Sequence, residues 1–78
     1  MEIRVLYFAN VRELVGKDWE IIRFTGSTTE ELRILLKRKY PQISKILDVS
    51  RLAVNNEYYE GELKEGDVVA IIPPVSGG

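Results

Sequence analysis

The sequence predicts an α+β domain in which one amphipathic helix packs across one face of a mixed sheet of four to five strands. Short apolar runs rich in β-branched residues occur near both ends of the chain, and one clear helical period lies between them. The chain has 78 residues, which suffices for one small core. A lone helix must bury its apolar stripe against the sheet, so two layers are expected.

The first predicted strand spans residues 2–9, where apolar side chains occur on both parities. The parity expected to face the helix carries Ile3, Val5 and Tyr7. The other parity carries Leu6 and Phe8, which we expect on the opposite face. Because one helix cannot cover both faces of a sheet, some apolar surface should remain exposed.

A short helix and a second strand follow. Asn10 can cap a helix over residues 11–15, and Gly16 is a natural stop signal. Residues 19–24 are rich in aromatic and β-branched side chains and are predicted to be a strand. The link between the two strands is short, so they are expected to pair as neighbours.

The main helix is predicted over residues 27–40. Ser27 and Thr28 are both candidate N-caps, because each is followed three residues later by a glutamate. The apolar stripe has helical spacing and consists of Leu32, Leu35, Leu36 and Tyr40. Pro41 ends this helix and can begin a second short one.

Three further strand segments are predicted in the last third of the chain. They are residues 52–54, a short edge segment at Tyr58-Tyr59, and residues 68–72. The last run is apolar at every position, which is typical of a central strand.

The composition argues against several classes of function. The chain has no Cys and no His, so it lacks a thiolate nucleophile, a soft-metal site and the usual general base. We therefore expect no metal site and no self-sufficient enzyme. The formal net charge of −1 gives no general affinity for nucleic acid or anionic membrane. No apolar run is long enough to span a bilayer, and a cytoplasmic protein is expected.

The chain ends in Pro73-Pro74-Val75-Ser76-Gly77-Gly78. The prolines end the preceding strand because neither can donate a backbone hydrogen bond, and they stiffen the exit. We therefore divide the chain into a folded domain, 1–72, and a flexible C-terminal Gly-Gly tail, 73–78. Two glycines make a thin backbone tip that can enter a narrow slot and present one group, the terminal carboxylate. Six extended residues reach about 20 Å, enough to enter another protein's active site.

Five phrases spread along the chain occur together in one known family. They are VLYFA at 5–9, REL at 12–14, AVN at 53–55, GDVVA at 66–70 and PPVSGG at 73–78. With these phrases the chain resembles the small subunit of molybdopterin synthase, a MoaD-type sulfur carrier. The resemblance implies the β-grasp, or ubiquitin-like, roll as the fold.

The same resemblance implies that Gly78 carries sulfur. In that family an ATP-dependent adenylating enzyme converts the terminal carboxylate to an acyl-adenylate. A sulfur donor, such as a persulfide-bearing sulfurtransferase, then replaces AMP and leaves a thiocarboxylate. Residues Pro73, Pro74, Val75, Ser76 and Gly77 enter a pocket of the large synthase subunit, where the sulfur passes to a pterin precursor. A heterotetramer of two small and two large subunits is implied. The chain itself is expected to bind no cofactor, since the partner uses the ATP.

Phe8, Tyr58 and Ile72 are predicted to form part of the surface that these partners hold, because they are apolar and expected near the tail. Other functions remain open on the sequence. They are a sulfur carrier for thiazole (thiamine) synthesis or for tRNA thiolation, a ubiquitin-like modifier that forms amide bonds with lysine, and a binding module for which the tail is irrelevant.

Overall fold

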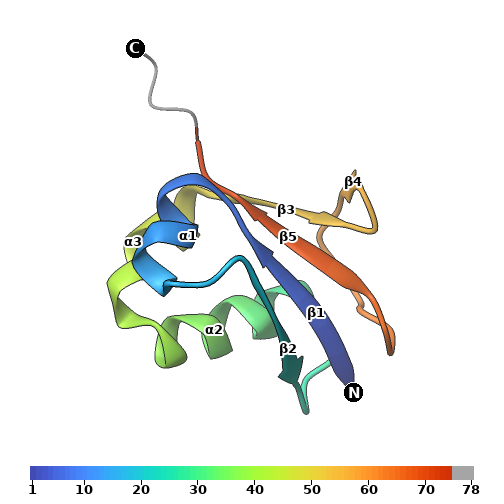
Figure 1. Cartoon of the computed structure of the whole chain (residues 1–78). Helices are drawn as coiled ribbons and strands as arrows, with labels where there is room; N and C mark the ends of the chain where they lie inside the picture. The colour runs from blue at the N-terminus through green and yellow to red at the C-terminus, as the bar shows by residue number, and fades with distance from the viewer. Residues whose placement is uncertain (75–78) are drawn as a thin grey trace.

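The computed structural model describes residues 1–74 and contains one five-stranded sheet with its helices on one face (Figure 1). The strands are β1 (Glu2–Tyr7), β2 (Trp19–Arg23), β3 (Arg51–Val54), β4 (Glu57–Tyr58) and β5 (Val68–Ile72). The helices are α1 (Ala9–Val15), α2 (Thr29–Lys39), the 3-10 helix η1 (Pro41–Ile43) and α3 (Ser44–Val49). The predicted α+β class with one main helix is confirmed. The predicted tail residues Val75, Ser76, Gly77 and Gly78 lie outside the described residues.

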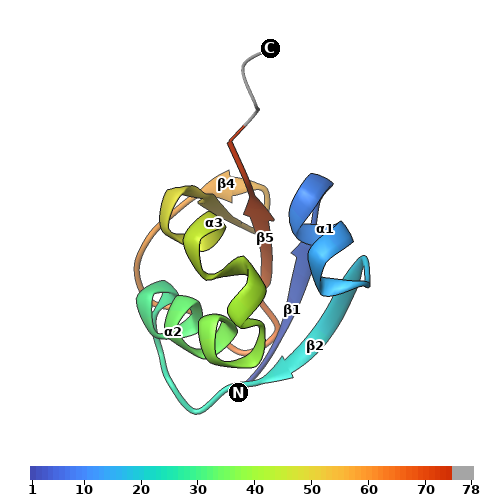
Figure 2. The ribbon, with the colours of Figure 1, turned by 90° about the vertical axis from the view of Figure 1, so that its left-hand side faces the viewer.

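The strand order is β2-β1-β5-β3-β4, and β5 occupies the central position that its apolar sequence predicted. β1 and β5 run parallel, whereas β1 pairs antiparallel with β2, and β3 pairs antiparallel with both β4 and β5. This mixed sheet with a helix across one face is the predicted β-grasp arrangement. Figure 2 looks onto the helix side, where α2 and α3 lie in front of the sheet and α1 lies near the end of β1 and the start of β2.

Alternation along the strands separates the core from an uncovered face. The inward side chains of the strands are buried, and they are Ile3, Val5, Tyr7, Ile22, Leu52, Val54, Val69 and Ile71. From the helix side, Leu32 and Leu36 of α2 and Leu47 of α3 are fully buried against them. The predicted parity of β1 is therefore confirmed, with Leu6 on the face away from the helices.

The capping box at the start of α2 uses the second of its two candidate N-caps. The Thr28 hydroxyl accepts a hydrogen bond from the Glu31 backbone N–H at 3.2 Å. The Glu31 carboxylate in turn accepts from the Ser27 backbone N–H at 3.2 Å and from the Thr28 hydroxyl at 3.1 Å. These hydrogen bonds, with that from the Ser27 backbone the largest cause, lower the pKa of Glu31.

Two local predictions need correction. Asn10 does not cap α1: the N-cap position is Phe8, which makes no side-chain cap, and the helix begins at Ala9. The chain turns into the helix directly after β1 because Ala9 adopts a positive φ of 49°. β4 lies at Glu57–Tyr58 rather than Tyr58-Tyr59. A two-residue turn with positive φ at both Asn55 and Asn56 sets this earlier register.

The Glu20 carboxylate connects β2, at the open edge of the sheet, to the end of α2. Oε2 of Glu20 accepts hydrogen bonds from the hydroxyls of Tyr7, at 2.6 Å, and Tyr40. Its Oε1 lies 3.5 Å from Lys17 Nζ and 3.4 Å from Lys39 Nζ. Burial by itself raises the pKa of Glu20, but the tyrosine hydrogen bonds and the lysines outweigh it, so the pKa is lowered. Burial, followed by the contact with Glu20, raises the pKa of Tyr40 to about 12.

Replacing Glu20 with Gln should lower the free energy of unfolding at neutral pH by about 1–3 kcal/mol, because charged hydrogen bonds are lost in a largely buried site. The depressed pKa of Glu20 means that its ionised form stabilises the fold above the ordinary carboxyl pKa. This contribution is lost as the pH falls below about 4.5 and through the lower folded-state value.

Urea denaturation of the wild type and the Glu20→Gln variant at pH 7 and at pH 3 measures both effects. The stability difference should be large at pH 7 and smaller at pH 3. Glu13→Gln, on an exposed side chain of α1, is the matched control and should change little. A Glu20→Gln variant with the pH dependence of the wild type would contradict this role.

Candidate functional site

The chain leaves the sheet at the edge where β1 and β5 both end. Because the two strands are parallel and Tyr7 pairs with Ile71, the next residues, Phe8 and Ile72, lie side by side at this edge. Pro73 is still buried, and Pro74 is the first exposed residue beyond β5. The predicted tail therefore starts next to the predicted partner residue Phe8.

An apolar surface covers the sheet face that carries no helix. We call it the outer-face patch, and it consists of Leu6, Phe8, Trp19, Ile21, Tyr58, Ala70 and Ile72. Register connects its members across all five strands: Trp19 pairs with Leu6, Leu6 with Ala70, Ala70 with Ala53, and Ala53 with Tyr58. Trp19 is 51% exposed and Tyr58 is 57% exposed. Apolar side chains this exposed and this contiguous are typical of a docking surface.

Two arginines flank the outer-face patch on its opposite sides. The Arg4 guanidinium lies 4.9 Å from the centre of the Trp19 ring, and the Arg51 guanidinium lies 3.6 Å from the centre of the Tyr58 ring. These cation–π contacts hold the exposed aromatic rings in place. They also put positive charge beside the apolar centre, so the patch suits a partner surface that is apolar in the middle and acidic at its rim.

The structure brings together the residues predicted as a partner surface. Phe8 and Ile72 are neighbours, and Arg51, which pairs with Ile72, connects them to Tyr58 on the far side of the sheet. Sequence reasoning missed Trp19 and Ile21 as members of the same surface. The available signal was the alternation within β2, because burying Ile22 and Phe24 forces Trp19 and Ile21 onto the opposite face. Their use as an interface stays a prediction.

Backbone strain occurs directly beside the exit of the tail. Ala9 has a φ of 49°, in the left-handed region that non-glycine residues rarely adopt. This conformation ends β1, so that Phe8 stays extended on the outer face, 43% exposed, while Val11 of α1 is fully buried on the opposite side. The turn at Ala9 therefore presents Phe8 beside the chain exit.

Among residues 1–74, no three side chains that can bind a metal come together. Within the same residues, no helix is both long enough and apolar enough to cross a bilayer. The candidate site thus consists of the outer-face patch and the chain exit, with Gly78 beyond the described residues.

Comparison with known proteins gives the family. Residues 5–78, almost the whole chain, match the ThiS family. The chain belongs to the ThiS family. Within it, the chain is 46% identical to the molybdopterin synthase sulfur carrier subunit of Dictyostelium discoideum, over 99% of this chain and 96% of that protein. The resemblance to the MoaD-type small subunit drawn from the five phrases is therefore confirmed.

Among the solved structures that are similar to this ThiS-family chain are two named for molybdopterin-converting factor. One is a putative molybdopterin converting factor, subunit 1, from Pyrococcus furiosus, with a TM-score of 0.86 and 32% identity over 96% of this chain and 99% of that one. The other is in a protein–protein complex of subunits 1 and 2 of molybdopterin-converting factor from Helicobacter pylori, with a TM-score of 0.73, 27% identity and full coverage of both chains. The predicted β-grasp fold is confirmed by these neighbours.

The strained turn gives a testable expectation. Ala9→Val should lower the free energy of unfolding by about 1–2 kcal/mol, because a β-branched residue tolerates a positive φ poorly. Ala9→Gly should leave the turn intact, because glycine adopts this conformation freely. Thermal unfolding of both variants, with Ala70→Val in extended β5 as the control, tests this. Equal stability of the valine and glycine variants would contradict the strain argument.

Proposed function

We propose that this chain is the sulfur carrier subunit of a molybdopterin synthase and that Gly78 carries the sulfur. The single observation that supports this most is the end-to-end similarity to a protein of that name, at 46% identity. The geometry agrees, since the chain exit leaves the sheet beside an exposed apolar surface that a partner can hold.

The chemistry follows from the terminus. A carboxylate is a poor electrophile until one of its oxygens becomes part of a good leaving group, so the Gly78 carboxylate is first adenylated with ATP and pyrophosphate departs. A sulfur nucleophile from a donor protein then attacks the acyl carbon and AMP leaves. When that nucleophile is a persulfide, its outer sulfur becomes bonded to the acyl carbon. A second thiol then attacks the donor sulfur and breaks the S–S bond, which leaves a thiocarboxylate on Gly78 and a disulfide on the donor. The thiocarboxylate sulfur attacks the pterin precursor, and water cleaves the resulting thioester, which returns the Gly78 carboxylate. The chain thus acts as a carrier that needs no nucleophilic side chain of its own.

The partners in this proposal are an ATP-dependent adenylating enzyme, a persulfide-bearing sulfur donor and the large synthase subunit. A heterotetramer with two copies of each synthase subunit is the proposed assembly. The similar protein from Helicobacter pylori occurs in a complex of subunits 1 and 2, which supports a large-subunit partner. We place the protein in the cytoplasm, because the activation step consumes ATP. The chain itself binds no cofactor in this scheme.

The outer-face patch is the surface that we assign to the large subunit. It is continuous with the chain exit through Phe8 and Ile72, so a partner that covers the patch also receives the tail. Pro73 is buried against the domain, so the path of the tail is directed from Pro74 onward. A proline pair loses little conformational entropy on insertion, which favours entry of the four residues that follow.

Loading of the terminus tests the proposed chemistry. After incubation with an adenylating enzyme, ATP and a sulfur donor, the intact mass should change by the replacement of one oxygen with one sulfur. Removal of Gly78 should abolish loading, because the carboxylate then lies about 3.5 Å short of its position in the activating site. Conjugates to lysine would instead indicate a ubiquitin-like modifier, and an unchanged mass would indicate a binding module.

Docking of the large subunit tests the proposed surface. Phe8→Asp should weaken binding of a large subunit by about 30-fold or more, because loss of a central aromatic contact typically costs 2 kcal/mol or more. Isothermal titration calorimetry measures the affinity, and circular dichroism checks that the fold is retained. The matched control is Val49→Asp, on an exposed residue of α3 on the opposite side of the sheet. Equal affinities of the two variants would contradict the assignment.

A further inference from the structure

The open edge of β2 has backbone groups that no other strand uses. Phe24 and Met1 exchange both backbone hydrogen bonds at 2.8 Å, and Tyr7 donates to the carbonyl of Asp18 at 2.8 Å. Antiparallel pairing alternates, so the even-numbered residues of this segment face β1. The N–H and C=O groups of Trp19, Ile21 and Arg23 therefore point away from the sheet. β2 ends the strand order, and in Figure 2 no described element lies beyond it.

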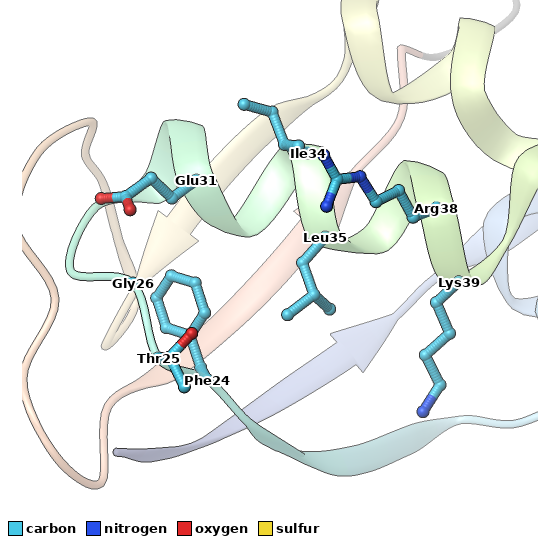
Figure 3. Close-up of a pocket in the computed structure, with 8 residues that line it drawn as sticks. All are labelled: Phe24, Thr25, Gly26, Glu31, Ile34, Leu35, Arg38 and Lys39. Atoms are coloured by element: carbon cyan, nitrogen blue, oxygen red, sulfur yellow. The ribbon is translucent and has the colours of Figure 1, made fainter.

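A groove runs beside this edge on the helix side of the sheet. It lies between the end of β2 with its following loop and the side of α2, and its volume is about 610 Å³. Its lining residues are Phe24, Thr25, Gly26, Glu31, Ile34, Leu35, Arg38 and Lys39. In Figure 3 Phe24 and Leu35 face each other across the groove, and Lys39 reaches down toward β2.

The apolar end of the groove depends on Gly26. A Cβ at this position would come within 2.7 Å of the Phe24 ring and 2.8 Å of the Glu31 carboxylate. The missing side chain therefore leaves room for Phe24 beside the loop. Glu31 belongs to the capping box at the start of α2, where its carboxylate already accepts hydrogen bonds from Ser27 and Thr28. The Glu31 carboxylate is therefore occupied by hydrogen bonds within the domain, and the apolar groups at this end belong to Phe24 and Leu35.

The other end of the groove is basic. Lys39 lies 3.4 Å from Glu20 on β2, so this end lies beside the first half of the strand. Arg38 forms no ion pair with any of the residues 1–74 and is exposed. The Arg38 guanidinium thus lies at the end of an apolar groove and beside the unpaired edge of β2. This arrangement is complementary to an extended peptide with an acidic end.

We propose that β2 and this groove bind an extended, acidic segment of a partner protein, which adds as a sixth strand to the sheet. Its backbone pairs with Ile21 and Arg23, one apolar side chain occupies the space between Phe24 and Leu35, and an acidic side chain contacts Arg38. The site lies on the helix side, away from the chain exit. It therefore goes beyond the proposed sulfur-carrier function.

A second copy of this chain fits the site less well. Pairing of β2 with its own copy would bring a second α2, with its basic end at Lys37, Arg38 and Lys39, to the same junction. Like charges across such an interface repel. The acidic segment of another protein is the occupant that matches the charge of the groove.

Nuclear magnetic resonance with the full ¹⁵N-labelled chain tests the proposal. The probe is a synthetic peptide of alternating valine and isoleucine residues with two glutamates at one end, and the control peptide carries two lysines instead. We expect the acidic peptide to shift the amide signals of β2 and α2 and to slow amide exchange at Trp19, Ile21 and Arg23. The lysine peptide should bind more weakly.

Two variants of the chain make the test specific. Arg38→Glu should weaken binding of the acidic peptide about tenfold or more, because attraction becomes repulsion. Lys45→Glu, the same charge change on exposed α3, should leave the affinity unchanged. Ile21→Pro removes an outward-pointing N–H without touching the ladder to β1, so it should abolish strand addition. Thermal unfolding checks that this variant is folded, and if it is not, Arg38→Glu decides.

Several results would overturn the proposal. They are absence of binding by the acidic peptide, signal shifts confined to β1, β3 and β5 with none in β2 or α2, and equal loss of affinity in the Arg38→Glu and Lys45→Glu variants. Sedimentation that shows a dimer dissociated by Ile21→Pro would identify a second copy as the occupant instead.

Discussion

Parallel pairing of β1 with β5 is the constraint on which the rest of the structure depends. It joins the first and last strands of the chain, with Arg4 opposite Val68 and Tyr7 opposite Ile71. Parallel partners end at the same edge of a sheet. The exit of the chain at Pro73 and Pro74 is therefore placed beside Phe8. The helices that lie between the two strands in the chain cover one face of the sheet. An antiparallel pairing would have sent the terminus to the opposite end of the domain.

The sheet is apolar on both faces, although the helices cover only one. Burying an aromatic side chain is worth about 1.5–3 kcal/mol, and Trp19 and Phe8 gain only part of this in the isolated chain. Arg4 and Arg51 partly compensate by lying over the exposed rings of Trp19 and Tyr58. A partner that buries the remaining apolar area would gain the hydrophobic free energy that the isolated chain does not. A surface of this kind beside the chain exit is consistent with a small domain without Cys or His that acts by being held by partners.

The helix side of the molecule is organised by charge as well as by packing. Glu20 accepts from Tyr7 and Tyr40 and lies between Lys17 and Lys39, which joins the edge strand to the end of α2. An inward-pointing charge on an edge strand discourages indiscriminate strand pairing. Arg38 stays outside this network. Glu20 thus disfavours pairing of β2 with most strands, whereas Arg38 favours a strand with an acidic side chain.

Local pattern determined much of this protein from sequence alone. The helical period of Leu32 and Leu36, the glutamates of the capping box and the parity of β1 depend on neighbours a few residues away, so the α+β class followed from them. The division at the tail, which the proline pair after β5 indicates, stays a prediction. The family phrases added the β-grasp name, and the role of Gly78 that they imply stays a proposal. Only the tertiary structure decided what depends on distant residues. The β2 register places Trp19 and Ile21 in the outer-face patch, the positive φ of Ala9 replaces the expected Asn10 cap, and the packing of α2 beside β2 creates the basic groove. The alternation within β2 is a local signal for the side of Trp19 and Ile21, but their neighbours in the patch, the turn at Ala9 and the groove depend on packing between elements far apart in the chain.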